Sequence, residues 1–210
     1  MRILLPGRLT FEKALALQEE LVEALQCGQT DETLILLEHE PVFTIGRTRD
    51  RSSLRSSLPY SVFETNRGGQ ATYHGPGQLT GYPILDLNKR GRDLHLYLRF
   101  LEDYLIHFSA GFGVTAQRRE GLTGVWVGER KLASLGIGVR KWISMHGFAI
   151  NILESSTTPF SSITPCGLVG VEMTSLEQEC GTTIDFETAL QEAVRLFEEM
   201  LPELSAAPGA

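Results

Sequence analysis

The sequence predicts an α+β fold in which mixed β-sheets are flanked by helices. The expected strands lie in adjacent groups, and helical patterns separate the groups instead of following every strand, which favours α+β over a doubly wound parallel sheet. The 210 residues, 42% of them hydrophobic, are enough for one substantial core. No repeat, low-complexity tract or linker divides the chain. We therefore expect a single domain over residues 1–210, with a disordered tail at about residues 205–210.

Three segments carry apolar residues at the three-and-four spacing of an amphipathic helix. The first begins after Thr10, the predicted N-cap, and stops at Gly28; the others span about 94–111 and 185–201. Short apolar or alternating runs predict strands at 2–5, 33–39, 42–46, 61–65, 82–87 and 146–152. The run 124–139 predicts a hairpin that turns at 128–130, and the polar, basic stretch 47–57 predicts a loop.

Charge and cysteine content disfavour several classes of protein. The net charge is 19 − 26 = −7, which disfavours nonspecific nucleic-acid binding. Cys27, Cys166 and Cys180 form no CxxC pair, which argues against a disulfide framework or a thiolate zinc site and favours a reducing compartment. The five histidines form no HxH or HxxxH pair, and nothing else indicates a metal or cofactor. Because the apolar runs are too short for a signal peptide or a membrane span, we expect a cytoplasmic protein.

A glycine-rich stretch, "NRGGQATYHGPGQLTGYP", runs from residue 66 to 83 around His74. Its glycines can supply turn conformations between strands, or they can let a ligand approach the main chain. Neither phosphate-binding fingerprint is present, since GxxxxGK[ST] is absent and no GxGxxG opens a helix after a strand. Composition leaves these two interpretations about even.

Cys166 and Lys131 are candidates for chemistry, each beside an ordinary alternative. Cys166 lies between a proline and a glycine in "TPCGL", which indicates an exposed turn suited to a nucleophile, although a lone cysteine is usually a small buried hydrophobe. Lys131 follows the predicted turn in "GERKLASLG" and precedes small and apolar residues. It is either a solvated hairpin charge or a side chain along a pocket wall.

Taken together and in order, five blocks resemble the lipoyl(octanoyl) transferases of lipoate biosynthesis. They are "LLEHEPVFTIGR" (36–47), "RGGQATYHGPGQLTGYPILDL" (67–87), "GVWVGERKLASLGIGV" (124–139), "MHGFAINI" (145–152) and "PCGLVGVEMTSL" (165–176). The resemblance implies an α+β fold like the catalytic domain of biotin and lipoate protein ligases. It also implies an acyltransferase that moves an octanoyl group from octanoyl-acyl carrier protein to a lysine. The implied acceptors are lipoyl domains of 2-oxoacid dehydrogenase subunits and the glycine-cleavage H protein.

The resemblance also assigns roles to residues. It implies that Cys166 becomes the acyl-thioester and that Lys131 activates it. The implied acyl-binding residues are Arg67, Gly68, Gly69, Gln70, Ala71, Thr72, Tyr73, His74, Ser134, Leu135, Gly136, Gly147, Phe148 and Ala149. The family needs no cofactor, and nothing implies a nucleic-acid or membrane partner.

The chemistry of a cysteine–lysine pair agrees with these roles. An unassisted thiol, with a pKa near ~8.5, is only a few per cent thiolate at neutral pH. An ammonium at about 4 Å contributes roughly 4 kcal/mol at an effective dielectric of ~20, enough to make the thiolate dominant. After acylation we expect neutral Lys131 to act as the base for the acceptor amine. Backbone N–H groups near Gly69 or Gly136 are preferred over His74 as donors to the oxyanion. Arg47, Arg49, Arg51 and Arg55 either dock the acidic donor or form an ordinary solvated loop.

Three other functions stay open from the sequence. An ATP-dependent lipoate or biotin protein ligase of the same fold would need an adenylate site and no nucleophilic cysteine. A Cys–His hydrolase, using Cys166 with His74 or His146, would release free octanoate. A catalytically silent carrier-binding module would bind both proteins and never become acylated.

Overall fold

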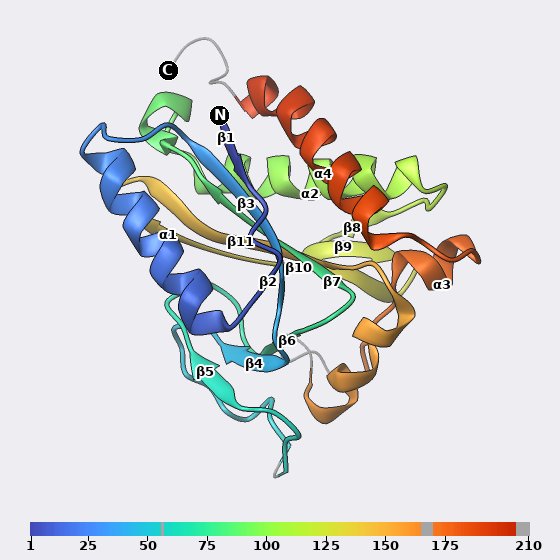
Figure 1. Ribbon diagram of the computed structural model, residues 1–210. Helices are drawn as coiled ribbons and strands as arrows, with labels where there is room; N and C mark the ends of the chain where they lie inside the picture. Colours follow the sequence, from blue (N-terminus) through green and yellow to red (C-terminus); the bar gives the residue numbers. More distant parts are fainter. Residues whose placement is uncertain (56, 165–169, 205–210) are drawn as a thin grey trace.

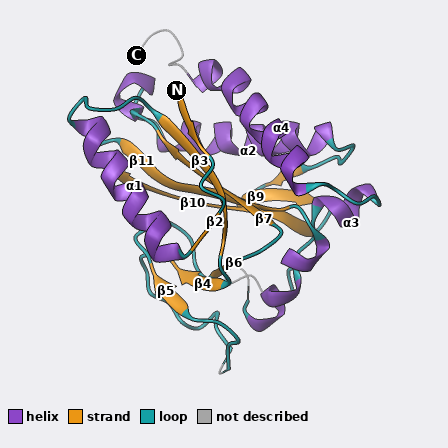
Figure 2. Ribbon diagram, in the orientation of Figure 1, coloured by secondary structure: helices purple, strands orange, loops and turns teal. Residues whose placement is uncertain are grey.

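In the computed structural model, residues 1–55, 57–164 and 170–204 are described, and their strands form a large and a small sheet (Figures 1 and 2). The eight-stranded sheet has the order β1-β3-β7-β11-β10-β9-β8, and β2 also pairs with β3. Its strands are β1 (Arg2–Leu4), β2 (Arg8–Leu9), β3 (Thr33–His39), β7 (Gln78–Ile84), β8 (Gln117–Arg119), β9 (Leu122–Val127), β10 (Arg130–Arg140) and β11 (Ile143–Asn151). Only β1 and β2 pair parallel with a neighbour in this sheet, so it is mixed but mainly antiparallel.

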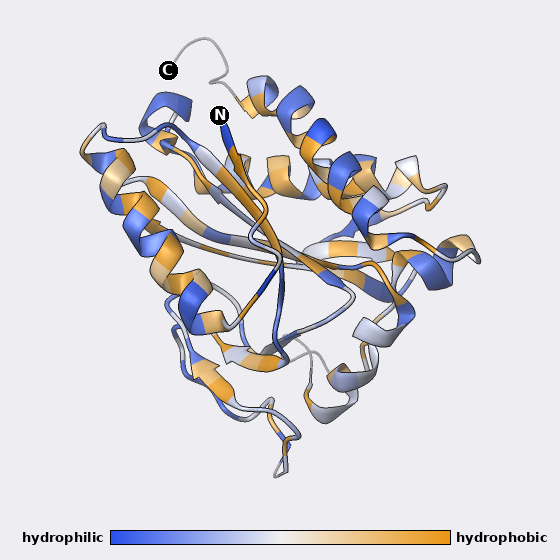
Figure 3. Cartoon of the chain, in the orientation of Figure 1, coloured by the Kyte–Doolittle hydropathy of each residue, from blue (hydrophilic) through white to orange (hydrophobic). Residues whose placement is uncertain are grey.

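The helices cover both faces of the large sheet (Figure 1). They are α1 (Phe11–Gln26), α2 (Leu94–Gly111), the short α3 (Leu176–Cys180) and α4 (Phe186–Met200). Along β3, Leu34 and Leu36 belong to the core under α2 and α4, whereas Ile35 and Leu37 belong to the core under α1. This alternation is the two-residue period of a strand buried on both faces. Figure 3 shows the resulting apolar stripes on the helices facing the sheet.

Predicted helix boundaries agree with the capping residues in the structure. Thr10 caps α1 by accepting from the Lys13 N–H at 3.4 Å, and Gly28 follows the helix with φ +66°. Asp93 and Asp185 cap α2 and α4 in the same way. No described helix is long and apolar enough to cross a bilayer.

The small sheet has the order β5-β4-β6 and lies at one end of the large sheet (Figure 2). Its strands are β4 (Val42–Ile45), β5 (Val62–Glu64) and β6 (Thr72–His74). Phe43 and Tyr73 pack with Phe160 and Ile163 into a core of their own. This arrangement sets β6 across from β7, β10 and β11, and the candidate site forms between them.

The sequence prediction was least accurate inside the glycine-rich stretch. We expected a strand at 82–87, but β7 spans Gln78–Ile84 and β6 precedes it. Gly81 lies inside β7, where the Phe148 ring occupies the place of a side chain: a Cβ there would come 2.1 Å from the ring. The short elements β8 and α3 were also missed, since so few residues carry little periodicity.

Candidate active site

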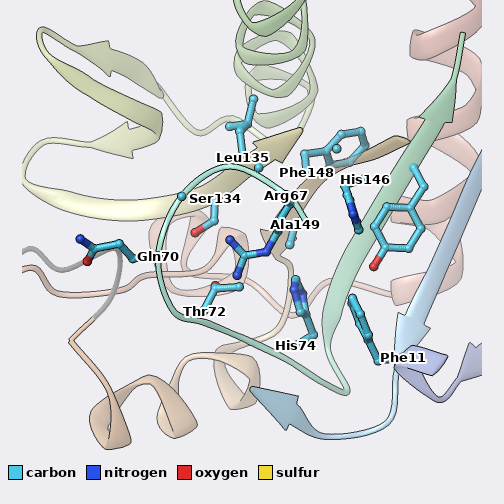
Figure 4. A pocket seen from close by; sticks show the side chains of 14 residues that line it. Phe11, Arg67, Gln70, Thr72, His74, Ser134, Leu135, His146, Phe148 and Ala149 are labelled. Carbon is cyan, nitrogen blue, oxygen red and sulfur yellow. The ribbon is translucent and has the colours of Figure 1, made fainter. Parts of the chain in front are cut away.

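A pocket opens between the small sheet and the central strands of the large one (Figure 4). Residues of the segment after β5 and of β6 form one wall, and residues of β10 and β11 form the other. All the expected acyl-binding residues line it except Gly68, Ala71 and Tyr73. Most of the residues that the resemblance implied for acyl binding therefore line one pocket. That they bind an acyl group stays a prediction.

Three lining residues are not among the expected acyl-binding residues: Phe11, Tyr82 and His146. His146 directly precedes Gly147, so the block "MHGFAINI" held a signal for it. Phe11 had none, because it begins α1 and reaches the pocket only through the fold. Its ring lies 6.2 Å from that of His74 and 5.0 Å from that of Phe63.

Glycines allow the pocket walls to approach one another at the level of the backbone. A Cβ on Gly46 would lie 1.9 Å from the Gly69 carbonyl oxygen, and one on Gly136 would lie 2.9 Å from that of Gly68. These contacts are closer than any side chain tolerates. The bare backbone thus serves chain-to-chain packing of the pocket wall, in addition to any ligand contact.

Arg67 places a guanidinium in the middle of the pocket, as Figure 4 shows. It is 7% exposed, and it donates to the Thr44 carbonyl and hydroxyl at 2.9 and 2.8 Å and to the Gly68 carbonyl at 2.9 Å. The free volume beside it is about 40 Å³.

His74 is held in one neutral tautomer. Its Nδ1 lies 2.9 Å from Gln78 Oε1, and the Gln78 amide nitrogen donates to the Tyr73 carbonyl and to Asn151 Oδ1. Since Gln78 presents its oxygen, His74 Nδ1 carries the proton and Nε2 is left as an acceptor. Burial first, and then the neighbouring His39 and the Arg67 charge, hold the pKa of His74 well below its usual value. A neutral ring in this tautomer cannot donate from Nε2, which favours backbone groups as oxyanion donors.

His39 and His146 extend this neutral cluster. Burial lowers the pKa of each to about 4. His39 bonds the Leu9 carbonyl through Nδ1 and the Tyr82 hydroxyl through Nε2, at 3.1 and 2.6 Å. His146 has φ +56°, its backbone N–H donates to Gln18 Oε1 at 2.8 Å, and its Nε2 has no hydrogen-bond partner among the described residues.

Lys131 is 1% exposed, so the solvated-hairpin interpretation is wrong. Its Nζ donates to the Thr123 carbonyl at 3.1 Å and lies 5.2 Å from the centre of the Trp126 ring. Its backbone pairs with the segment after residue 170: its N–H donates to the Glu172 carbonyl at 2.8 Å, and its carbonyl accepts from the Thr174 N–H at 2.9 Å. Lys131 is three positions before Ser134 on β10, although it does not itself line the pocket.

Cys166 falls in the stretch 165–169, outside the described residues. The described chain on its two sides is anchored near the pocket. The Thr164 N–H donates to the Ser53 carbonyl at 2.7 Å, and the Ser53 hydroxyl donates to Gln70 Oε1 at 3.1 Å. Beyond residue 170 the chain pairs with Lys131. The other cysteines lie at helix ends, Cys27 after α1 and Cys180 at the end of α3.

The basic loop contains Arg47, Arg49, Arg51 and Arg55. It lies next to residues 162–164, which precede the stretch 165–169. All four arginines are exposed. Arg49 and Arg51 both approach Glu64, at 3.5 and 3.0 Å. Leu54 bridges to Ile163 by backbone pairing. In the described parts of the chain, no group of three or more His, Cys, Asp or Glu side chains is arranged to hold a metal ion.

Comparison with known proteins gives consistent matches. The model of the lipoyl protein ligase A/B catalytic domain matches residues 10–198. The octanoyltransferase of Geobacter metallireducens is 48% identical over 208 residues, which are 97% of each chain. A crystal structure of lipoate-protein ligase A bound with ATP superposes with a TM-score of 0.81 at 16% identity, covering 96% of this chain and 85% of that one. Biotin protein ligase from Aquifex aeolicus gives 0.56 at 14%, covering 97% and 69%. The expected α+β fold of lipoate and biotin ligases is confirmed.

Proposed function

We propose a function from the premise that the chain belongs to the octanoyltransferases of the lipoyl protein ligase A/B catalytic domain family. The enzyme transfers an octanoyl group from octanoyl-acyl carrier protein, through a thioester on Cys166, to a lysine amine on lipoyl domains and on the glycine-cleavage H protein. The reaction takes place in the cytoplasm, in keeping with the cysteine pattern. It needs no ATP, because the donor thioester is already activated.

The observation that carries this proposal is the backbone pairing of Lys131 with Glu172 and Thr174. This pairing holds the buried lysine beside the chain that leaves residues 165–169. The pocket wall starts three residues further along the same strand, at Ser134. Both features support a nucleophile from that stretch working next to an ammonium and at the mouth of an acyl pocket.

The reaction is a thioester exchange followed by aminolysis of the acyl-cysteine. The Cys166 thiolate attacks the donor carbonyl carbon, the oxyanion collapses, and the carrier thiolate leaves with the proton of the Lys131 ammonium. The acceptor amine then attacks the acyl-cysteine, neutral Lys131 takes its proton, and the Cys166 thiolate departs as the amide forms. Backbone N–H groups near Gly69, where φ is +81°, are the preferred oxyanion donors.

Mass spectrometry after incubation with octanoyl-acyl carrier protein, without ATP, tests the proposal. We expect one octanoyl group on the wild type and on the control Cys27→Ser, and none on Cys166→Ser. Strict dependence on ATP would instead support a ligase. Release of free octanoate without a modified lipoyl domain would support a hydrolase, and binding of both proteins without acylation would support a silent module.

The two roles of Lys131 separate in the variant Lys131→Arg. Arginine keeps the charge but does not act as a base. We expect a larger loss in transfer from the acyl-enzyme to a lipoyl domain than in acyl-enzyme formation. Wild-type rates for both half-reactions would exclude the base role.

The exposed arginines of the basic loop supply a docking surface for the acidic donor. The loop pairs with residues 162–164, which lead toward Cys166. Reversing the charge at Arg47 and Arg55 should lower kcat/KM for the carrier-bound donor about tenfold and weaken its dependence on salt. Arg195→Glu on α4 combined with Lys141→Glu, which together change the net charge by the same amount, is the control. If both variants behave alike, the donor does not dock on this loop.

A further inference from the structure

Glu102 lies almost fully buried on α2, 1% exposed, and bonds β9, the strand that pairs with Lys131 on β10. Its Oε2 accepts from Arg99 Nη1 at 2.7 Å and from Arg118 Nε at 3.0 Å. Its Oε1 accepts from the backbone N–H of Gly124 on β9 at 3.2 Å. A carboxylate that bonds two arginines and a main-chain group is fixed in place more firmly than one in a surface ion pair.

The peptide group that Glu102 holds is the one that holds the lysine. The Gly124 N–H and the Thr123 carbonyl belong to the same peptide unit. The carboxylate accepts from the first, and Lys131 Nζ donates to the second at 3.1 Å. A negative charge at the N–H end and a positive charge at the carbonyl end polarise the peptide in the same direction, so the two hydrogen bonds strengthen each other.

The backbone around this peptide is shaped for the lysine side chain. Gly124 has φ +129°, and a Cβ there would come 2.7 Å from Lys131 Cε and 3.2 Å from Nζ. On the facing strand, the pairing of β10 with β9 shifts register between Lys131 and Ala133. Such a bulge re-aims the neighbouring side chain. The lack of a Cβ at Gly124 therefore leaves room for the Lys131 side chain beside the Thr123 carbonyl.

We propose that Glu102 is a positioning residue for octanoyl transfer. Its hydrogen bond to the Gly124 N–H fixes the Thr123–Gly124 peptide, and the carbonyl of that peptide orients the Lys131 ammonium. The inference rests on the proposed role of Lys131 as charge partner of Cys166. Among the described residues, Glu102 bonds Arg99, Arg118 and Gly124. Its effect reaches the reaction through a single peptide group, and a small displacement of an oriented group is costly in rate.

Two variants separate the hydrogen bond to the Gly124 N–H from the negative charge of Glu102. Glu102→Asp keeps the charge but is one methylene too short to reach both Arg118 and the Gly124 N–H. Glu102→Gln keeps the length and an acceptor oxygen but loses the charge. The matched control is Glu32→Asp, because Glu32 likewise bonds an arginine, Arg90, and a backbone N–H, that of Asp86, on a different part of the sheet.

The readouts are single-turnover acyl-enzyme formation and the pH profile of Cys166 alkylation by iodoacetamide, with thermal unfolding measured alongside. For Glu102→Asp we expect about tenfold slower acylation at pH 7, recovery toward wild type at pH 9, and an alkylation midpoint about one pH unit higher. Glu102→Gln should fall between wild type and Glu102→Asp, because its one acceptor oxygen can still bond the Gly124 N–H while its NH2 group then faces Arg99 and Arg118. Glu32→Asp should lose stability without moving either profile.

The positioning role of Glu102 would be excluded if Glu102→Gln were impaired and Glu102→Asp were not. It would also be excluded if both variants kept the wild-type acylation rate and alkylation profile. The alkylation assay needs no donor protein, so it decides the role of Glu102 even if octanoyl-acyl carrier protein is not the donor. If Lys131→Met leaves the alkylation profile unchanged, the inference fails together with the charge-partner role, whereas ATP-independent acylation can still stand.

Discussion

Lys131 and His74 are both nearly inaccessible to solvent, yet their surroundings treat a positive charge in opposite ways. Lys131 donates to the Thr123 carbonyl, lies over the face of Trp126, and is linked through one peptide to the carboxylate of Glu102. His74 faces Arg67 and two other histidines, and Gln78 fixes its proton on Nδ1. Burial is the largest cause of the lowered pKa of His74, and the charge of Arg67 adds to it, whereas the partners of Lys131 include a carbonyl oxygen and the face of an aromatic ring.

A buried chain of hydrogen bonds connects the two regions. Gln78 bonds Asn151, and Asn151 donates to the Thr174 carbonyl at 2.9 Å. The Thr174 N–H in turn donates to the Lys131 carbonyl. Each amide along this chain has its donor facing an acceptor. His74 and Lys131 are therefore connected by one continuous network of buried hydrogen bonds.

The largest expected effect comes from removing the charge at the lysine end. Lys131→Met should slow acyl-enzyme formation about 30-fold at pH 7, because the unassisted thiol is only a few per cent ionised there. Much of the rate should return at pH 9. Single-turnover acylation measures it, with exposed Lys141→Met as the control. An equal loss at both pH values would indicate a structural role for Lys131.

Next in size is a change in the pocket wall that leaves the charges alone. Gly46→Ala places a methyl 1.9 Å from the Gly69 carbonyl oxygen, so the wall at 67–69 must move. We expect kcat/KM for the octanoyl donor to fall about tenfold, as expected for a misplaced binding group. Gly111→Ala, where the added methyl meets only ordinary contacts, is the control. An unchanged kcat/KM would show that this wall does not bind the acyl group.

A smaller effect should follow from cutting the connection between the two regions. Asn151→Ala leaves Gln78 and the Thr174 carbonyl each short of a buried partner, which costs about 1–3 kcal/mol of unfolding free energy. We expect acylation to slow only a few-fold. Urea unfolding and single-turnover acylation give the two numbers, with exposed Asn88→Ala for comparison. A loss of stability without any change in rate would mean that the chain does not position Lys131.

The smallest effect concerns stability and pH. Buried histidines with lowered pKa values stay neutral in the folded protein, while they take up protons near their usual pKa of about 6.5 when unfolded. Their stabilising contribution is present above pH 6.5 and is lost as pH falls toward about 4. His39→Gln should reduce the slope of unfolding free energy against pH in this window by about 1.4 kcal/mol per pH unit. Exposed His95→Gln should leave the slope unchanged; equal slopes in His39→Gln and wild type would contradict a neutral His39.

Local patterns in the sequence anticipated much of the fold. The three-and-four spacing after Thr10 predicted α1, and the apolar run 33–39 matches β3 residue for residue. The turn at 128–130 predicted the β9–β10 hairpin. Lys131 and most pocket residues followed from a resemblance of ordered blocks. Phe11 and Glu102 could not be found in this way, because each lies on an amphipathic helix and looks like an ordinary helical residue.

By itself, the sequence determined most of the helices and strands and that the chain is an α+β protein, because periodicity, caps and turns are local properties. Only the tertiary structure decided what those residues experience. The same lysine in "GERKLASLG" would be a solvated charge on an isolated hairpin. In the folded protein it is buried, its Nζ donates to the Thr123 carbonyl, and the chain after residue 170 pairs with its backbone. Those contacts join residues far apart in the chain, so no local pattern encodes them.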